Sequence, residues 1–195
     1  MIQFVVFDLG GVLCDVDLTR GRRRCGELGY PLSVFEAVED SGAKFEADRG
    51  RMTVSQMLDT VRSRCPAAEG LTESELRQMW GAIVSWRSYV PDILEGLRVP
   101  YGVLSVIDPI HAAALGDLPG ASPCVYSCDI GHVKPDHAAY RELIAQSRRR
   151  PEHILFVDDR DENVAAARYC GLRAERVWDK ASLVAALGSL LQQTS

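Results

Sequence analysis

Hydrophobic positions in the second half of the chain alternate between short continuous runs and helical spacing. The runs predict strands and the helically spaced segments predict helices, a pattern typical of a parallel sheet with crossover helices. The predicted strands lie at about 101–106, 123–126, 153–157 and 174–178, and the helices at about 108–116, 136–148, 161–170 and 180–192. The last helix carries Leu183, Val184, Leu187, Leu190 and Leu191 on one face. Residues 2–7 form another apolar run, which must join the same sheet from far away in the sequence.

Between the first and second of these strands, residues 16–88 have a helical pattern and no convincing strand. Two capping boxes lie there, Thr53-Val54-Ser55-Gln56 and Thr72-Glu73-Ser74-Glu75, each with apolar residues at helical spacing after it. We therefore expect an α/β core of residues 1–15 and 89–195, a Rossmann-like parallel sheet with helices on both faces. Residues 16–88 are expected to form a helical insertion between the first and second core strands, with hinges near 14–18 and 86–99.

Composition narrows the class of protein. The chain has 195 residues, 47% of them hydrophobic and 25% charged, which suits one globular domain with a small insertion. The net charge of −5 gives no reason to expect nucleic acid or an anionic membrane as partner. The six cysteines show no zinc-ligand spacing, so we expect reduced thiols in the cytoplasm. No signal peptide and no membrane span are expected, because a basic leader and a run of about 18 apolar residues are both missing.

Polar side chains follow the predicted strands where each one ends. Asp8 comes directly after the first strand and is followed by Gly10 and Gly11, which allow a ligand to approach the backbone closely. Ser105 ends the second strand, and Lys134-Pro135 opens a helix. The carboxyl ends of parallel strands lie at one edge of the sheet, where open α/β sheets bind their ligands. Each residue alone has an ordinary structural explanation, but together they predict a site.

The residue types indicate phosphoryl chemistry. A carboxylate such as Asp8 can attack a phosphoryl group and form an aspartyl-phosphate. Ser105 and the backbone amides after it can bind phosphoryl oxygens, and Lys134 can pair with Asp8 and with the phosphoryl group. The chain has few lysines among its 22 basic residues, and a cation at a helix N-terminus opposes the dipole, which favours a functional Lys134.

Two adjacent acids, Asp158 and Asp159, end another strand. Like charges side by side are costly unless a cation neutralises them, and Mg²⁺ prefers one or two carboxylates with water and phosphate oxygens. Alternation along a strand keeps both acids from pointing the same way, so one is a direct ligand and the other acts through water or holds Lys134. The structural alternative is that Asp159 caps the next helix.

These residues identify a resemblance. The chain resembles the haloacid dehalogenase-like (HAD) hydrolase superfamily over essentially its full length. The resemblance rests on three sequence motifs: Phe-Asp-Leu-Gly-Gly-Val-Leu, Lys-Pro-Asp and Phe-Val-Asp-Asp-Arg-Asp-Glu-Asn. Small bacterial phosphatases of the sugar-phosphate type are the most similar in character, and the insertion would be the family's cap.

The resemblance implies a role for each position. Asp8 would be the nucleophile and a metal ligand, and Gly10 would offer its carbonyl to Mg²⁺. Asp159 would bind the metal directly, with Asp158 as its neighbour in the metal site. The phosphoryl group would be bound by Ser105, the Val106 amide, Gly11 and Lys134, and Lys134 would also steady the phosphoenzyme.

Two departures from the family pattern matter. The phosphatases usually carry a second Asp two residues after the nucleophile as general acid and base, and here that residue is Gly10. Asp15 and Asp17 are candidates to replace it, although acids in a turn are their simpler explanation. The second departure is Val106 after Ser105, where relatives often have Asn.

The function expected is a Mg²⁺-dependent phosphatase of a small phosphorylated metabolite, with a sugar phosphate as one candidate. One alternative is a weak or inactive member that binds a phosphometabolite or a protein, because Gly10 replaces the acid/base Asp. A 2-haloacid dehalogenase is less favoured, because the acidic pair argues against it. Four residues of the insertion, in a turn before a helix, are candidates to face the site: Phe45, Asp48, Arg49 and Arg51. The sequence leaves the substrate and the oligomeric state open.

Overall fold

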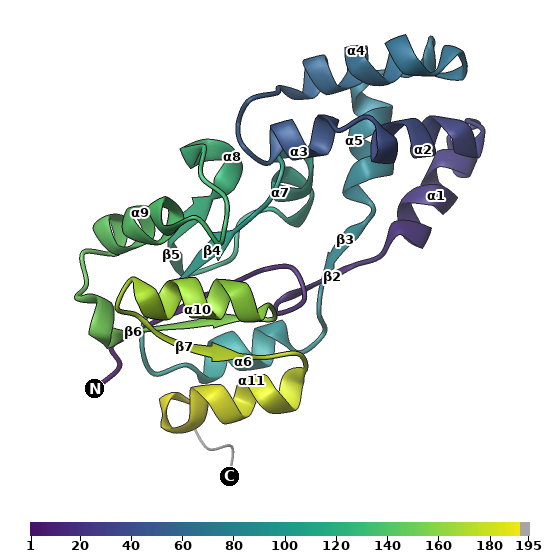
Figure 1. Cartoon of the computed structure of the whole chain (residues 1–195). Helices are drawn as coiled ribbons and strands as arrows, with labels where there is room; N and C mark the ends of the chain where they lie inside the picture. Colours follow the sequence, from purple (N-terminus) through teal and green to yellow (C-terminus); the bar gives the residue numbers. More distant parts are fainter. Residues whose placement is uncertain (192–195) are drawn as a thin grey trace.

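Five parallel strands form the central sheet of the computed structural model, which describes residues 1–191 (Figure 1). Their order across the sheet is β5-β4-β1-β6-β7, so the first strand of the chain lies at the centre. The strands are β1 (Phe4–Phe7), β4 (Tyr101–Ser105), β5 (Ala121–Tyr126), β6 (Ile154–Asp158) and β7 (Arg173–Arg176). The predicted parallel sheet is thereby confirmed, including the long-range entry of the first strand.

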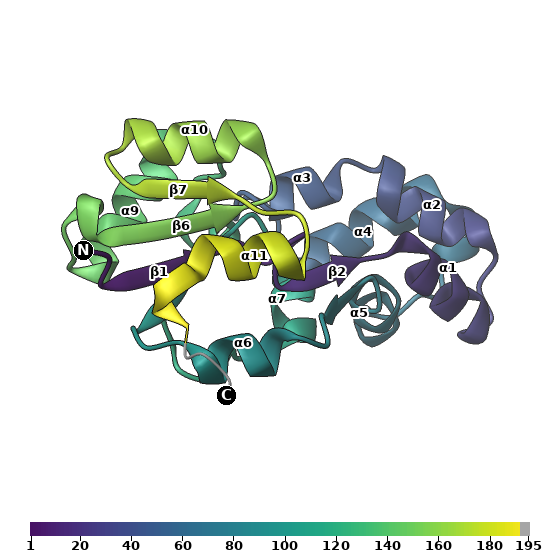
Figure 2. The ribbon, with the colours of Figure 1, turned by 90° about the horizontal axis from the view of Figure 1, so that it is seen from below.

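Helices cover both faces of this sheet (Figure 2). Alternate residues of β1 enter different apolar clusters: Val5 and Phe7 pack on one face, and Phe4 and Val6 on the other. The first face is covered by α6 (Val90–Gly96), α7 (Pro109–Leu115) and α11 (Lys180–Leu187), and the second by α9 (His137–Ser147) and α10 (Asp161–Tyr169). A sheet buried on both sides explains why its strands read as continuous apolar runs.

The C-terminal helix differs from the prediction. It ends at Leu187, where Gly188 has a positive φ of 47°, and a 3₁₀ turn (Gly188–Leu190) follows. Leu183 and Leu187 are buried, whereas Val184 is 40% exposed, so the five apolar residues do not share one buried face. Residue 192, the last of the predicted helix, lies outside the described residues.

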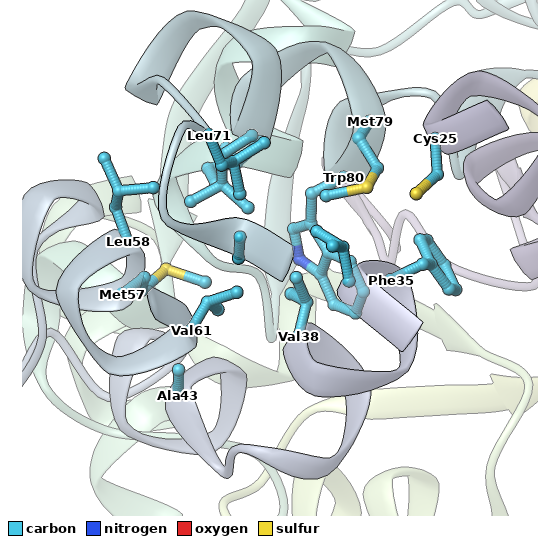
Figure 3. Packing of buried hydrophobic residues seen from close by; sticks show 14 of the residues in the cluster. Cys25, Phe35, Val38, Ala43, Met57, Leu58, Val61, Leu71, Met79 and Trp80 are labelled. Atoms are coloured by element: carbon cyan, nitrogen blue, oxygen red, sulfur yellow. The ribbon is translucent and has the colours of Figure 1, made fainter. Parts of the chain in front are cut away.

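A body of five helices lies between the strands β1 and β4. We call residues 18–81 the helical body; its helices are α1 (Leu18–Glu27), α2 (Leu32–Asp40), α3 (Ala43–Ala47), α4 (Val54–Arg64) and α5 (Glu73–Gly81). Both predicted capping boxes form, at Thr53 with Gln56 and at Thr72 with Glu75. The body has an apolar cluster of its own, in which Phe35, Met57 and Trp80 are among the buried side chains (Figure 3). Ile110 of α7 joins this cluster, so the helical body packs directly on the sheet-bearing part of the chain.

A two-stranded antiparallel ribbon connects the helical body to the sheet. It consists of β2 (Cys14–Val16) and β3 (Val84–Trp86), with Asp15 opposite Ser85. The prediction of no strand within 16–88 is wrong here, because three-residue strands are too short to produce a clear alternation in the sequence. The strand β2 lies within the first expected hinge, 14–18, whereas β3 ends where the second, 86–99, was expected to begin. The two chain crossings are paired with each other in this ribbon.

Short elements complete the fold. They are α8 (Ser127–Ile130), which precedes the Lys134 segment, and the 3₁₀ turns Pro66–Ala68 and Pro151–His153. Within residues 1–191, no helix has the length and apolar character needed to cross a bilayer. All six cysteines, which lie in the described residues, are free thiols.

Candidate functional site

A cavity of about 570 Å³ lies at the carboxyl ends of the central strands. Its wall combines residues after β1 and β6 with residues of the helical body and of the connecting ribbon. The lining residues are Asp8, Gly10, Gly11, Asp15, Val16, Lys44, Asp48, Arg87, Val106, Lys134, Asp159, Arg160 and Asn163. This volume suits a small metabolite, and the charged lining suits a polar one.

Lys134 links two carboxylates at the base of this cavity. Its Nζ lies 2.9 Å from Oδ1 of Asp8 and 2.6 Å from Oδ2 of Asp158, and all three side chains are buried. β1 and β6 are neighbours in the sheet, so the two acids leave adjacent strand ends. The ammonium also lies over the Phe156 ring, 5.3 Å from its centre. A buried ion pair of this kind fixes the position of all three groups.

Asp158 has both carboxylate oxygens engaged. Besides Lys134, the carboxylate accepts hydrogen bonds from the backbone N–H of Arg160 at 2.9 Å and from Nδ2 of Asn163 at 2.9 and 3.1 Å. Asp158 is therefore a structural anchor for the lysine and for the start of α10.

Asp159 lies beside this anchor and lines the cavity. One oxygen each of Asp8, Asp158 and Asp159 lie within 4.8 Å of one another. Gly11 makes this arrangement possible, because a Cβ at that position would lie 2.2 Å from Oδ2 of Asp159. Gly11 also has a φ of 74°, which glycine adopts without strain. Its backbone N–H donates to the carbonyl of Cys14 at 3.0 Å, so in this structure that amide already has a partner.

The cluster carries more negative charge than Lys134 alone balances. Burial raises the pKa of Asp8 to about 6, although the Lys134 charge opposes the rise. Burial and the neighbouring Asp158 charge also raise the pKa of Asp159. Raised carboxyl pKa values mean that a proton or another cation is favoured at the cluster. Hard oxygen donors at this separation fit Mg²⁺.

Ser105 and Val106 lie at the end of β4, the other neighbour of β1. Val106 lines the cavity, and Ser105, the residue before it, is 3% exposed. Gly10 also lines the cavity, and a Cβ placed on it would have its nearest neighbour, Cγ2 of Val16, at 3.8 Å. The structure thus brings Asp8, Lys134 and the acidic pair into contact and leaves open space at Gly10.

The helical body supplies two charged residues to the cavity, Lys44 and Asp48. Lys44 Nζ lies 2.7 Å from each oxygen of Asp48, one helical turn later in the sequence. Lys44 was missed in the sequence, although its spacing from Asp48 is a signal of such a pair. Of the four residues expected to face the site, only Asp48 lines the cavity within the described chain. The other three lie elsewhere: Phe45 is exposed, Arg49 stacks on its ring, and Arg51 pairs with Glu46.

The connecting ribbon contributes a further ion pair. Nε of Arg87 donates to Oδ1 of Asp15 at 2.8 Å, and both residues line the cavity. Asp15 was a candidate acid/base from the sequence, but its side chain is 54% exposed. Asp17, the other candidate, caps α1 and accepts from the backbone N–H of Thr19.

A second buried charge cluster joins the helical body to α7. Asp108 caps α7 and accepts from Nε1 of Trp80 at 3.3 Å and from Nδ1 of His111 at 2.7 Å. Nε2 of His111 faces the carbonyl of Trp80 at 3.0 Å. Both ring nitrogens of His111 therefore lie within hydrogen-bond distance of an oxygen atom. Burial alone would raise the pKa of Asp108, but the hydrogen bonds and charge of His111 outweigh it and lower the pKa to about 2.

Known proteins are similar to this chain in sequence and in fold. The family model described as haloacid dehalogenase-like hydrolase matches residues 2–171. A D-ribitol-5-phosphate phosphatase of Bacteroides thetaiotaomicron is 27% identical over 188 residues, which cover 88% of this chain and 89% of the relative. A HAD family enzyme of the same species, solved with magnesium and inorganic phosphate, has a TM-score of 0.77 and 18% identity over 94% of this chain and 99% of its own. A predicted HAD-like hydrolase of Porphyromonas gingivalis has a TM-score of 0.77 and 24% identity, with 100% of both chains covered.

Proposed function

Since the chain belongs to the haloacid dehalogenase-like hydrolases, we propose that it is a Mg²⁺-dependent phosphatase that forms an aspartyl-phosphate on Asp8. The observation that carries this proposal is the buried bridge of Lys134 between Asp8 and Asp158, with Asp159 beside it in the cavity. This set combines a nucleophile, a cation for the phosphoryl group and an acidic cluster for a metal.

The hydrogen bonds of Asp8 support its role as nucleophile. Its Oδ1 accepts from the backbone N–H of Leu9 at 2.7 Å and contacts Lys134 Nζ at 2.9 Å. Held through that oxygen, the carboxylate can present its other oxygen to phosphorus. The lysine would then neutralise charge on the phosphoryl group, and the Val106 amide with Ser105 at the end of β4 would bind its oxygens.

The acidic cluster supports Mg²⁺ as the cofactor. Asp8, Asp159 and the carbonyl of Gly10 would hold the ion, and Asp158 would complete the cluster while orienting Lys134. When bound, Mg²⁺ would neutralise the phosphoryl oxygens and lower the repulsion between the ester and the carboxylates. The raised pKa values of Asp8 and Asp159 are the signature of a cluster that favours such a cation.

A phosphorylated sugar or polyol is the substrate class we propose. The relative from Bacteroides thetaiotaomicron acts on D-ribitol 5-phosphate, and the cavity wall beyond the acidic cluster is charged. The pairs Lys44–Asp48 and Arg87–Asp15 offer donors and acceptors to hydroxyl groups of a leaving group. The free thiols support a reducing compartment, the cytoplasm, as its location.

Phosphate release from a panel of esters tests the proposal. The panel contains D-ribitol 5-phosphate, sugar phosphates and para-nitrophenyl phosphate, each with Mg²⁺ or with EDTA. We expect turnover that needs Mg²⁺ and disappears in Asp8→Asn, because the amide cannot act as the nucleophile. Ser182→Ala, in the α11 cap far along the chain, serves as the control variant and should retain activity. Turnover that survives both EDTA and Asp8→Asn would refute the mechanism.

A further inference from the structure

The proposed phosphatase lacks a proton donor two residues after its nucleophile, at Gly10. Gly10 has no side chain, and the cavity is open there. An alkyl phosphate needs a proton on its leaving oxygen, and the second step needs a base for water. General acid–base groups of this kind contribute about 10²–10⁴-fold to the rate. Another group of the cavity must therefore take this role if the enzyme hydrolyses alkyl esters efficiently.

Among residues 1–191, four carboxylates line the cavity, and three of them already have another role or partner. Asp8 is the nucleophile, and Asp159 belongs to the acidic cluster. Asp15 is 54% exposed and paired with Arg87. The fourth, Asp48, comes from the helical body, lines the cavity and has a side chain that is only 12% exposed.

The segment that carries Asp48 is fixed against the sheet-bearing part of the chain. Asp48 directly follows α3 as its C-cap. Two residues later, Gly50 lies so close to α8 that a Cβ there would come within 2.3 Å of the Cys128 carbonyl. Lys44 holds both oxygens of Asp48 at 2.7 Å and lies 3.8 Å from Asp108. The two contacts with Lys44 therefore orient the Asp48 carboxyl group, which lines the cavity.

The surroundings of Asp48 suit a group that exchanges protons. Burial raises its pKa above the ordinary aspartate value, and the Asp108 charge adds to the rise. The charges of Lys44 and His111 lower the pKa and so limit this rise. A carboxyl whose pKa lies closer to neutrality than usual is the better general acid and base.

We propose that Asp48 is the general acid and base of this phosphatase and replaces the side chain missing at Gly10; this rests on the proposed function. In the first step an Asp8 oxygen bonds to phosphorus while the ester P–O bond breaks. The bonding pair goes to the leaving oxygen, and the Asp48 carboxyl gives that oxygen its proton. In the second step the Asp48 carboxylate takes a proton from water, and the water oxygen bonds to phosphorus. The Asp8–phosphorus bond breaks with its pair returning to Asp8, and inorganic phosphate leaves.

The leaving group distinguishes this role from a structural one. Para-nitrophenolate is a stable leaving group and needs no proton. The ribitol oxygen of D-ribitol 5-phosphate, in contrast, must be protonated as it leaves. In Asp48→Asn, kcat/KM for D-ribitol 5-phosphate, or for the best alkyl ester of the panel, should fall by about 10²–10⁴-fold. The kcat/KM for para-nitrophenyl phosphate should change by less than about tenfold. Because the second step also loses its base, this variant should release a burst of nitrophenolate equal to the enzyme present and accumulate phosphoenzyme.

Two further variants make the test specific. Glu46→Gln removes a carboxylate of α3, two residues before Asp48, that does not line the cavity. This variant should hydrolyse both esters at the wild-type rate. Gly10→Asp in the Asp48→Asn background should restore alkyl ester hydrolysis, because the nearest atom to a Cβ there is 3.8 Å away. Thermal unfolding of each variant shows that the losses are not losses of fold.

Several results would overturn the proposal. They are an unchanged alkyl-ester rate in Asp48→Asn, an equal loss on both esters without a burst, or a leaving-group-dependent loss in Asp15→Asn instead. In each case the wild type remains an active phosphatase, so the proposed function stands. A wild type without turnover on any ester would instead refute the proposed function itself.

Discussion

The buried contact between Asp108 and His111 allows the loss of stability in Asp108→Asn to be predicted quantitatively. Asp108→Asn keeps an oxygen that caps α7, because asparagine is as good an N-cap as aspartate. It removes the negative charge that lies 2.7 Å from Nδ1 of His111. The substitution therefore isolates the charge from the helix cap. Since Trp80 of the helical body also donates to this carboxylate, the change acts where the body packs on α7.

The expected cost follows from the pKa of Asp108. A fall from the ordinary 3.8 to about 2 corresponds to about 2 kcal/mol of folding free energy, at ~1.4 kcal/mol for each pKa unit. The pKa is lower in the folded state, so this stabilisation is present above about pH 4 and is lost as the pH falls toward about 2.

Chemical denaturation at pH 7 and at about pH 3 measures both the size of this loss in stability and its pH dependence. Asp108→Asn should lower the free energy of unfolding by about 2 kcal/mol at pH 7 and by about 1 kcal/mol at about pH 3. Asp136→Asn is a matched control, because Asp136 also caps a helix, α9, and also lies near a histidine, His132 at 3.5 Å. Both of those side chains are about half exposed, so this substitution should cost less than about 0.5 kcal/mol.

Two results would refute this reasoning. A loss below about 0.5 kcal/mol in Asp108→Asn at pH 7 would mean that the buried pair does not stabilise the fold. A loss of equal size at pH 7 and about pH 3 would mean that charge is not its origin.

Further predictions concern the acidic cluster and the helical body. Gly11→Ala should weaken Mg²⁺ binding by about 10–100-fold in calorimetric titration, because its Cβ would displace the Asp159 carboxylate, and an unchanged affinity would contradict this. Mg²⁺ affinity should fall as the pH drops below about 6, because protons compete at Asp8; titrations at about pH 5 and about pH 7.5 that agree would contradict it. Gly21→Ala should destabilise by about 1–3 kcal/mol, because its Cβ would lie 2.5 Å from an aromatic carbon of α2. Gly26→Ala in the same helix places its Cβ more than 4 Å from any neighbouring atom and should stabilise the protein by about 0.5–1 kcal/mol. Equal effects of the two substitutions on the free energy of unfolding would contradict both predictions.

The sheet and its acidic cluster could be predicted because their signals are local. Each apolar run marks a strand buried on both faces, and topology requires the ends of parallel strands to meet at one edge. Asp8, Lys134 and Asp158 are 24 or more residues apart in sequence, yet each follows a recognisable element. Their meeting therefore follows from the order of elements and not from the details of packing.

The contribution of the helical body could not be predicted in the same way. Whether Asp48 or its neighbours face the cavity depends on how the body packs on α7 and α8, through contacts such as Trp80 with Asp108. Helical periodicity shows which face of a helix is buried but not which neighbour it meets. The ribbon strands β2 and β3 were missed for a related reason, since their pairing is a contact across about 70 residues rather than a local pattern.

The ribbon has an evolutionary consequence. Where the chain enters and leaves the helical body, the N–H of Asp17 donates to the carbonyl of Ile83 at 2.9 Å, so the body begins and ends at one point. A segment with adjacent ends and an apolar cluster of its own can be exchanged as a cassette without rethreading the sheet. Under the proposed function, selection can thus replace Lys44 and Asp48 of the cavity wall while Asp8 and Lys134 stay in place. Grafting residues 17–83 between relatives is accordingly a direct way to transfer substrate preference.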